Sequence, residues 1–197
     1  MTTRAVVRRP RLWRMFRAPL RRQFDTLASG WDNRIGPEGL IPLGAALDAL
    51  PDPPRRVLDL GTGTGRAARV VAKRFPAAEL VGLDLSPEMI EKANELLPSE
   101  LAGRVRFQVG DASALAHEDE SFDLVVLMNM IPFFEELARV TAPAGHAVFA
   151  FSFGADTPIY VPPETLRARL ERLGFEDFRE LAAGHGNALL ATKKKAP

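Results

Sequence analysis

The sequence contains no cysteine, one tyrosine, two tryptophans and three histidines among its 197 residues. Without cysteine, disulfides, thiolate metal sites and a cysteine nucleophile are excluded. His117, His146 and His185 are far apart and lack metal-ligand spacing, so we expect surface or loop positions and no bound metal. No apolar run approaches the ~20 residues that cross a bilayer. No uninterrupted apolar core follows the N-terminal charges, which argues against a signal peptide, and we expect a cytoplasmic protein.

Acidic residues are absent from the first 22 positions, which hold eight arginines. The rest of the chain has 18 basic residues against 25 acidic ones, a net charge of −7. An acidic body argues against a nucleic-acid-binding surface over the whole domain. We interpret residues 1–23 as a separate basic arm, although an organelle transit peptide has a similar composition.

The arm has two parts. Residues 1–9 are basic and without periodicity, which predicts disorder. From Pro10 to Phe24, apolar residues recur at steps of three and four with arginines between them. This pattern predicts a basic amphipathic helix, with Pro19 interrupting it or starting a second one. We favour a lid helix that packs its apolar side on the core; weak binding to an anionic membrane or a partner is the alternative.

The most informative stretch is residues 57–74. A short apolar run containing Asp59 is followed by glycines at alternate positions and then by apolar residues at helical spacing; the glycines are Gly61, Gly63 and Gly65. This predicts a strand, a tight turn and a helix, the start of a βαβ unit. Glycine permits positive φ and close approach of a ligand, and the helix N-terminus offers free N–H groups. Asp59 suits an ammonium group better than a pyrophosphate, so we expect a ligand with a cation near the turn.

This stretch resembles motif I of class I S-adenosylmethionine-dependent methyltransferases, D/E-x-G-x-G-x-G, at Asp59, Gly61, Gly63 and Gly65. The resemblance covers about residues 24–192, followed by a basic tail at 193–197. It implies an α/β, Rossmann-like doubly wound sheet of seven strands, mostly parallel with an antiparallel last strand, and helices on both faces. We expect helices between the first five strands. The implied cofactor is S-adenosyl-L-methionine, with S-adenosyl-L-homocysteine as product.

Further segments extend the resemblance to the rest of the cofactor. Asp84 ends the second predicted strand, nineteen residues after Gly65, where such folds place a ribose-binding acid. Ser86 and Pro87 then predict a helix start. The D-x-S-P-E-M-I sequence resembles motif II, which implies that Leu85 and Met89 lie near the adenine. Gly110-Asp111-Ala112 resembles the G-D-A segment of the family, which implies that Asp111 accepts from the adenine amino group. The predicted cofactor-binding residues are Asp59, Gly61, Thr62, Gly63, Gly65, Asp84, Leu85, Met89, Asp111, Ala112 and Asn129.

The acceptor side is less defined. Residues 121–129 predict a strand buried on both faces, and Asn129 ends it at the edge where ligands bind. Asn129 is our candidate for orienting the acceptor, although two residues separate it from Pro132, unlike in the N-P-P-Y/F motif of amino-group methyltransferases. Residues 24–32 resemble a segment that folds over the cofactor in this family; anchoring the arm to the core is the alternative. The pocket candidates are Phe24, Trp31, Phe133 and Tyr160.

Together these features predict methyl transfer by in-line displacement to an unidentified small-molecule acceptor. No constellation of residues defines a catalytic base, so no catalytic residue is assigned beyond Asn129. Two other classes stay open. An NAD-dependent oxidoreductase is disfavoured by Asp59, by Arg66 in place of the last fingerprint glycine, and by the lack of a Tyr-x-x-x-Lys relay. A non-catalytic nucleoside-binding module of the same fold is the second. The oligomeric state stays open.

Overall fold

The computed structural model describes residues 2–33 and 36–195. Seven strands form one sheet in the order β3-β2-β1-β4-β5-β7-β6. Their bounds are β1 Arg56–Leu60, β2 Glu79–Asp84, β3 Val105–Val109, β4 Phe122–Met128, β5 Thr141–Phe151, β6 Phe175–Ala183 and β7 Gly186–Lys193. Neighbours pair in parallel up to β5, and β7 is antiparallel to both β5 and β6. The predicted sheet is confirmed, including its antiparallel last strand.

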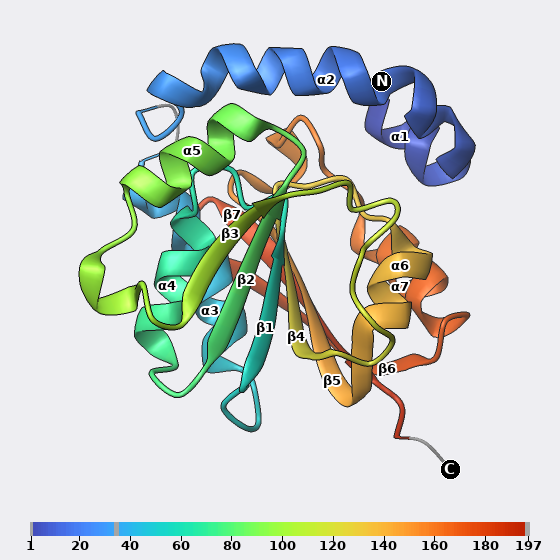
Figure 1. Cartoon of the computed structure of the whole chain (residues 1–197). Helices are drawn as coiled ribbons and strands as arrows, with labels where there is room; N and C mark the ends of the chain where they lie inside the picture. Colours follow the sequence, from blue (N-terminus) through green and yellow to red (C-terminus); the bar gives the residue numbers. More distant parts are fainter. Residues whose placement is uncertain (1, 34–35, 196–197) are drawn as a thin grey trace.

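Helices cover both faces of the sheet (Figure 1). On one side lie α3 (Ile41–Asp48), α4 (Arg66–Arg74) and α5 (Pro87–Glu95), and on the other lie α6 (Phe134–Val140) and α7 (Pro163–Glu171). Short 3-10 turns are η3 (Pro37–Leu40), η4 (Ser99–Leu101) and η5 (Gly154–Asp156). Residues 110–121, all of them described, connect β3 to β4 without a helix. The prediction of helices between the first five strands is therefore wrong at this connection.

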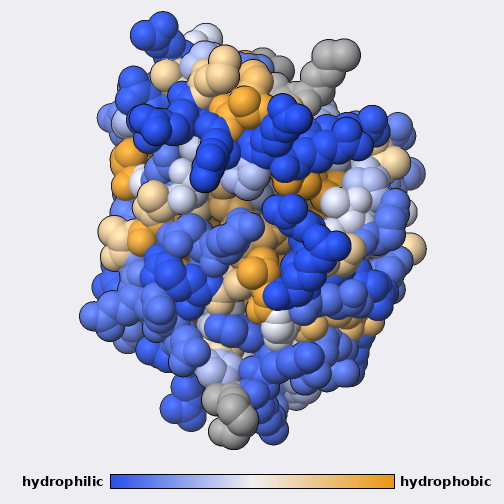
Figure 2. Space-filling model, turned by 90° about the vertical axis from the view of Figure 1, so that its right-hand side faces the viewer, coloured by the Kyte–Doolittle hydropathy of each residue, from blue (hydrophilic) through white to orange (hydrophobic). Residues whose placement is uncertain are grey.

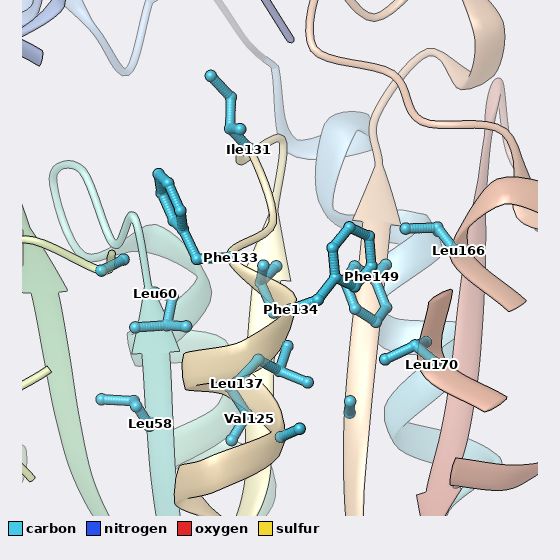
Figure 3. Packing of buried hydrophobic residues seen from close by; sticks show 14 of the residues in the cluster. Leu58, Leu60, Val125, Ile131, Phe133, Phe134, Leu137, Phe149, Leu166 and Leu170 are labelled. Atoms are coloured by element: carbon cyan, nitrogen blue, oxygen red, sulfur yellow. The ribbon is translucent and has the colours of Figure 1, made fainter. Parts of the chain in front are cut away.

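The core consists of two apolar clusters, one on each face of the sheet. Successive strand residues point to opposite faces, so Leu58 and Leu60 join the α6 and α7 side while Val57 joins the α3 and α4 side. Figure 3 shows Phe134 turned toward Phe149, with Leu166 and Leu170 beyond; the ring centroids of Phe134 and Phe149 are 6.4 Å apart. Each large apolar side chain buried in this way contributes about 1.5–3 kcal/mol. The clusters hold the carboxyl ends of β1, β2 and β4 at one edge.

Two expectations about polar residues are wrong because their neighbours bury them. His146 lies inside β5, half-buried, with Nδ1 3.2 Å from Thr192 Oγ1, rather than on the surface or in a loop. Burial lowers its pKa. Lys193 ends β7, and its Nζ donates to the carbonyl oxygens of Ala138 and Thr141 at 2.8 and 2.7 Å. The solvated tail therefore starts after Lys193 among the described residues.

The arm is folded. It comprises α1 (Thr2–Arg8), η1 (Pro10–Leu12) and α2 (Trp13–Leu27), followed by η2 (Ala28–Gly30). The prediction of disorder is wrong for residues 2–9, because Val6 and Val7 are buried in the cluster that also contains Trp13. Isolated short helices are marginal, so this burial is what stabilises α1. Met1 lies outside the described residues.

Pro19 does not interrupt α2. A proline removes one donor, leaving the carbonyl four residues earlier without its helical partner. That carbonyl belongs to Met15, and both residues are exposed, so water can bond to it. The helix lies across the carboxyl edge of the sheet (Figure 1) and continues through residue 23, so the proposed boundary between arm and domain stays a prediction. No helix of the described chain combines the length and apolar character that a membrane span requires.

Candidate functional site

A cavity of about 590 Å³ lies at the carboxyl edge of the sheet, beneath α2. Its walls come from the arm, the turn after β1, the end of β2, the β4–α6 connection and the loop at 153–159. Eight predicted cofactor residues line it: Gly61, Thr62, Gly63, Asp84, Leu85, Met89, Ala112 and Asn129. A cavity of this size suits a small organic molecule.

The glycine turn forms the floor of the cavity. Gly61, Gly63 and Gly65 have φ of +68°, +53° and +77°, a region that glycine enters without the Cβ clash of other residues. The Gly63 N–H donates to Asp84 Oδ2 at 2.9 Å. A Cβ on Gly63 would lie 3.5 Å from Trp31 Nε1 and 4.0 Å from Met89 Sδ. Backbone is therefore exposed to a ligand between these two side chains.

Asp84 joins the turn after β1 to the turn after β2. Its Oδ2 accepts from Gly63 N and its Oδ1 from Ser86 N, each at 2.9 Å. Burial raises its pKa, while the hydrogen bonds from Ser86 and Gly63 act in the opposite direction. Ser86 in turn caps α5 by accepting from Met89 N at 3.1 Å. Each Asp84 oxygen keeps a lone pair, so the side chain can still accept from the hydroxyls of a ribose.

Asp59 lies beneath the glycine turn and does not line the cavity. It is fully buried, its Oδ2 accepts from Thr62 Oγ1 at 2.6 Å, and its Oδ1 has no hydrogen-bond partner among the described residues. Burial raises its pKa from 3.8 to about 7, and the charge of Asp84 adds to the shift. A buried acceptor without a donor is costly, and an ammonium group reaching it would supply one. Because Asp59 is outside the cavity lining, its predicted contact with the ammonium group of the cofactor stays a prediction.

Asp111 is held by the arm. Its Oδ1 accepts from Trp13 Nε1 and Ser113 N, both at 2.9 Å, and its Oδ2 from Arg17 Nη1 at 3.2 Å. Burial raises the pKa of Asp111, but hydrogen bonds from Ser113, Trp13 and Arg17 keep it below its usual value. Asp111 is outside the cavity lining, whereas Ala112 is part of it. Its predicted contact with an adenine amino group stays a prediction.

Asn129 has a left-handed backbone, with φ of +51°. Its side chain bridges to β5: Nδ2 donates to Ser152 Oγ at 2.8 Å and Oδ1 accepts from Ser152 N at 2.9 Å. Asn129 therefore fixes the loop at 153–159 that forms one wall of the cavity. One N–H of the amide remains for a ligand, so a role in orienting the acceptor stays a prediction.

The arm and the segment after it cover the cavity through aromatic and polar contacts. Phe24 and Trp31 pack edge to face at 5.6 Å, and Phe133 meets Trp13 at 5.0 Å. Asp25 accepts from Ser86 Oγ at 2.6 Å. Phe24, Trp31 and Phe133 line the cavity, as expected of pocket residues. Tyr160 packs on Phe151 at 5.0 Å instead and is outside the lining.

Sequence reasoning did not single out several lining residues. They are Thr3, Trp13, Leu20, Gln23 and Leu27 from the arm, Thr64, Arg66 and Ala67 beside the glycine turn, and Met128, Met130, Ile131, Phe153, Thr157, Pro158 and Ile159 near the other wall. The three- and four-residue spacing in α2 was the available signal for the first group. Within the described part of the chain, no cluster of three acidic or histidine residues is able to hold a metal ion, and the expectation of no metal stays a prediction.

Comparison with known proteins agrees with this geometry. Residues 57–145 match the family model of the methyltransferase domain. The chain carries a class I methyltransferase domain. It is 37% identical over 147 residues to malonyl-[acyl-carrier protein] O-methyltransferase of Halorhodospira halophila, covering 70% of this chain and 49% of the relative. It is 39% identical over 111 residues to demethylmenaquinone methyltransferase of Deinococcus radiodurans, covering 53% and 46%.

A solved structure shows how far the fold of the methyltransferase domain extends. A SAM-dependent methyltransferase from Aquifex aeolicus superimposes with a TM-score of 0.65 at 19% identity, covering 85% of this chain and 97% of that one. The chain spans about half the length of the two relatives above. The fold and the family of the domain are therefore shown, and the acceptor is not.

We predict that Gly63→Ala weakens binding of S-adenosylhomocysteine, because the methyl group of the new alanine enters the space between Trp31 and Met89. The positive φ alone costs about 1–2 kcal/mol of stability. Gly174→Ala is the matched control, with φ of +84° and no atom within 4 Å of the new Cβ. Both variants should melt earlier, but only Gly63→Ala should lose affinity in calorimetry. Equal affinities would mean that the ligand does not approach this backbone.

We predict that Asp59→Asn stabilises the ligand-free protein at pH 8 while weakening S-adenosylhomocysteine binding. The folded-state pKa of Asp59 is raised to about 7, so the stability linked to its protonation is present at low pH and is lost as pH rises from about 4 to about 7. At pH 8 this loss reaches about 4 kcal/mol as an upper limit. Thermal melts should therefore separate variant from wild type by several degrees at pH 8 and much less at pH 5. A separation independent of pH would contradict this protonation behaviour.

We predict that Asp111→Ala abolishes discrimination between S-adenosylhomocysteine and S-inosylhomocysteine, which has a carbonyl in place of the adenine amino group. Wild type should prefer the adenosine compound about tenfold, as for one hydrogen bond to a charged acceptor. Trp13→Phe, which loosens the arm but keeps the carboxylate, should preserve the ratio of the two dissociation constants. If Asp111→Ala preserves it too, Asp111 serves only to hold the arm.

Proposed function

We propose that this protein transfers a methyl group from S-adenosylmethionine to a small, largely apolar acceptor. The observation that carries the proposal is the Gly63 turn joined to the Asp84 carboxylate inside one cavity whose remaining lining is mostly apolar. Asp84 suits the ribose, the exposed Gly63 backbone permits close approach, and the unpartnered Asp59 Oδ1 suits the ammonium group. Cofactor and acceptor would then share one enclosed space.

Beyond the predicted cofactor residues, the cavity lining is mostly apolar. The large apolar side chains are Leu20, Phe24, Leu27, Met130, Ile131, Phe133, Phe153 and Ile159, and polar side chains among them are Thr3, Gln23, Thr64, Arg66 and Thr157. Such walls exclude water and stabilise an acceptor with an apolar body. The printed names of relatives include methyltransferases of demethylmenaquinone and of tocopherol, which supports an apolar acceptor here.

S-adenosylmethionine supplies a methyl group that is already electrophilic because it is bonded to a sulfonium. The protein's work is therefore to align the acceptor atom with that methyl group and to remove water from between them. Asp84 and the glycine turn form the side of the cavity where the cofactor would bind. Phe24, Trp31 and Phe133 line the acceptor side of the cavity, and Asn129 holds the loop at 153–159 through Ser152. The need for a base depends on the pKa of the acceptor.

We predict micromolar binding of S-adenosylhomocysteine and no binding of NAD in calorimetry with the full chain. Incubation with a methyl-labelled donor and a panel of quinols, phenols and polar acids of matched size should label the apolar members. NAD binding without S-adenosylhomocysteine binding would overturn the assignment of the ligand. Binding without labelling of any acceptor would favour the non-catalytic nucleoside-binding module.

Two variants test the acceptor side of the same prediction. Ile159→Asp places a charge in the apolar wall and should reduce labelling at least tenfold while leaving S-adenosylhomocysteine affinity unchanged. Ile41→Asp is the control, because Ile41 is exposed and does not line the cavity. If both variants label equally well, the acceptor does not use this wall.

A further inference from the structure

The arm carries a basic face, which we define as Arg4, Arg8, Arg9, Arg11, Arg14, Arg17, Arg21 and Arg22. All eight side chains are exposed. Arg17 pairs with Asp111 at 3.2 Å and Arg21 is 3.8 Å from Asp25. The other six make no ion pair within residues 2–33 and 36–195. Most of this positive charge is therefore not used to hold the fold together.

The apolar side of α2 is already occupied. Trp13 is buried, and Phe16 and Leu20 pack against the core cluster. Arg22 is seven residues after Met15, almost two full turns, so the two residues share a helix face, and Met15 is 69% exposed there. The apolar side of α2 is therefore not available to insert into another surface. The side chains on its outer side are mostly arginines.

The α2 part of the basic face lies over the cavity. Leu20, Phe24 and Leu27 of the same helix line the cavity from the inner side, so the arginines stand on the outside of that wall. In Figure 2 hydrophilic residues cover most of the face shown, including the upper end, where the arm lies in Figure 1. A partner that binds this part of the basic face is consequently separated from the cavity only by the helix α2.

We propose that the basic face docks this protein on an anionic lipid bilayer. Each arginine near an anionic bilayer surface strengthens binding about fivefold. At 1.5 Å per residue, the 15 residues of α2 extend the charge along about 22 Å, and α1 extends it further, which suits a plane of headgroups. The docking does not depend on methyl transfer, and the proposed apolar acceptor gives it a use, since such molecules partition into the bilayer.

A small acidic protein is the competing partner, and the geometry disfavours it. Protein interfaces combine a buried apolar centre with a polar rim. On the described arm the single large apolar side chain that is mostly exposed is Met15, and the arginines are spread over two helices instead of surrounding an apolar centre. Anionic lipid headgroups can bind the exposed arginines through charge alone, without an apolar centre.

The test is co-sedimentation of the full chain with vesicles. We expect binding to vesicles of 30% phosphatidylglycerol in phosphatidylcholine at 0.1 M NaCl and no binding to pure phosphatidylcholine. At 1 M NaCl the protein should be released, because the Debye length falls to about 3 Å. Combined Arg11→Gln, Arg14→Gln and Arg22→Gln should weaken binding about a hundredfold. These three side chains make no ion pair among the described residues, so helix content and S-adenosylhomocysteine affinity should stay unchanged.

The matched control replaces three exposed arginines outside the arm, with Arg55→Gln, Arg106→Gln and Arg172→Gln. It lowers the net charge equally and should retain vesicle binding. An equal loss in both triple variants would overturn a localised docking face. So would absence of binding to anionic vesicles, or binding to a purified acidic acyl carrier protein in their place. Because sedimentation uses no methyl donor, failure here is distinguishable from failure of S-adenosylhomocysteine to bind.

Discussion

The contact on which the site depends is the hydrogen bond from the Gly63 backbone to the Asp84 carboxylate. The ends of β1 and β2 are adjacent because the strands pair in parallel, but pairing alone leaves the following turns free to diverge. The Leu83 carbonyl accepts from Gly61 N and Thr62 N at 2.8 and 3.0 Å. Asp84 removes the remaining freedom by accepting from Gly63 on one side and Ser86 on the other. Because Ser86 also caps α5 and donates to Asp25, the same carboxylate sets the floor of the cavity and, through one further bond, the position of α2 above it.

The sequence allowed prediction of the features that neighbouring residues determine, namely the glycine turn, the start of α5 and the strands. The alternating glycines permit positive φ at each position, and all three adopt it. Ser86 caps α5 because its hydroxyl reaches a free N–H three residues on. The most apolar segments form the expected strands β1, β2 and β4, which are buried on both faces. The cavity side of α2 was also readable, because apolar residues at three- and four-residue steps identify the face that packs inward.

Long-range contacts explain what the sequence could not show. Residues 2–9 look unstructured by themselves, and only burial of Val6 and Val7 against the body makes α1. His146 and Lys193 look like surface residues until their neighbours in the sheet and α6 are known. Asp111 is the most instructive case: its motif points to a nucleoside, yet Trp13 and Arg17, more than ninety residues earlier, bind it. No local pattern encodes such a partner.

The two carboxylates Asp59 and Asp84 and the arginines of the arm are on opposite sides of the helix α2, which forms a wall of the cavity. Asp59 is fully buried and Asp84 is partly buried. Burial raises the pKa of both carboxyl groups, and the charge of Asp84 raises the pKa of Asp59 further. Keeping two such groups together costs stability, and Asp59 Oδ1 has no donor among the described residues. The arm places its positive charges outside this wall, at Arg17 and beyond, where they are solvated and do not neutralise the pair. The helix α2 therefore separates the carboxylates beneath it from the arginines on the outer surface.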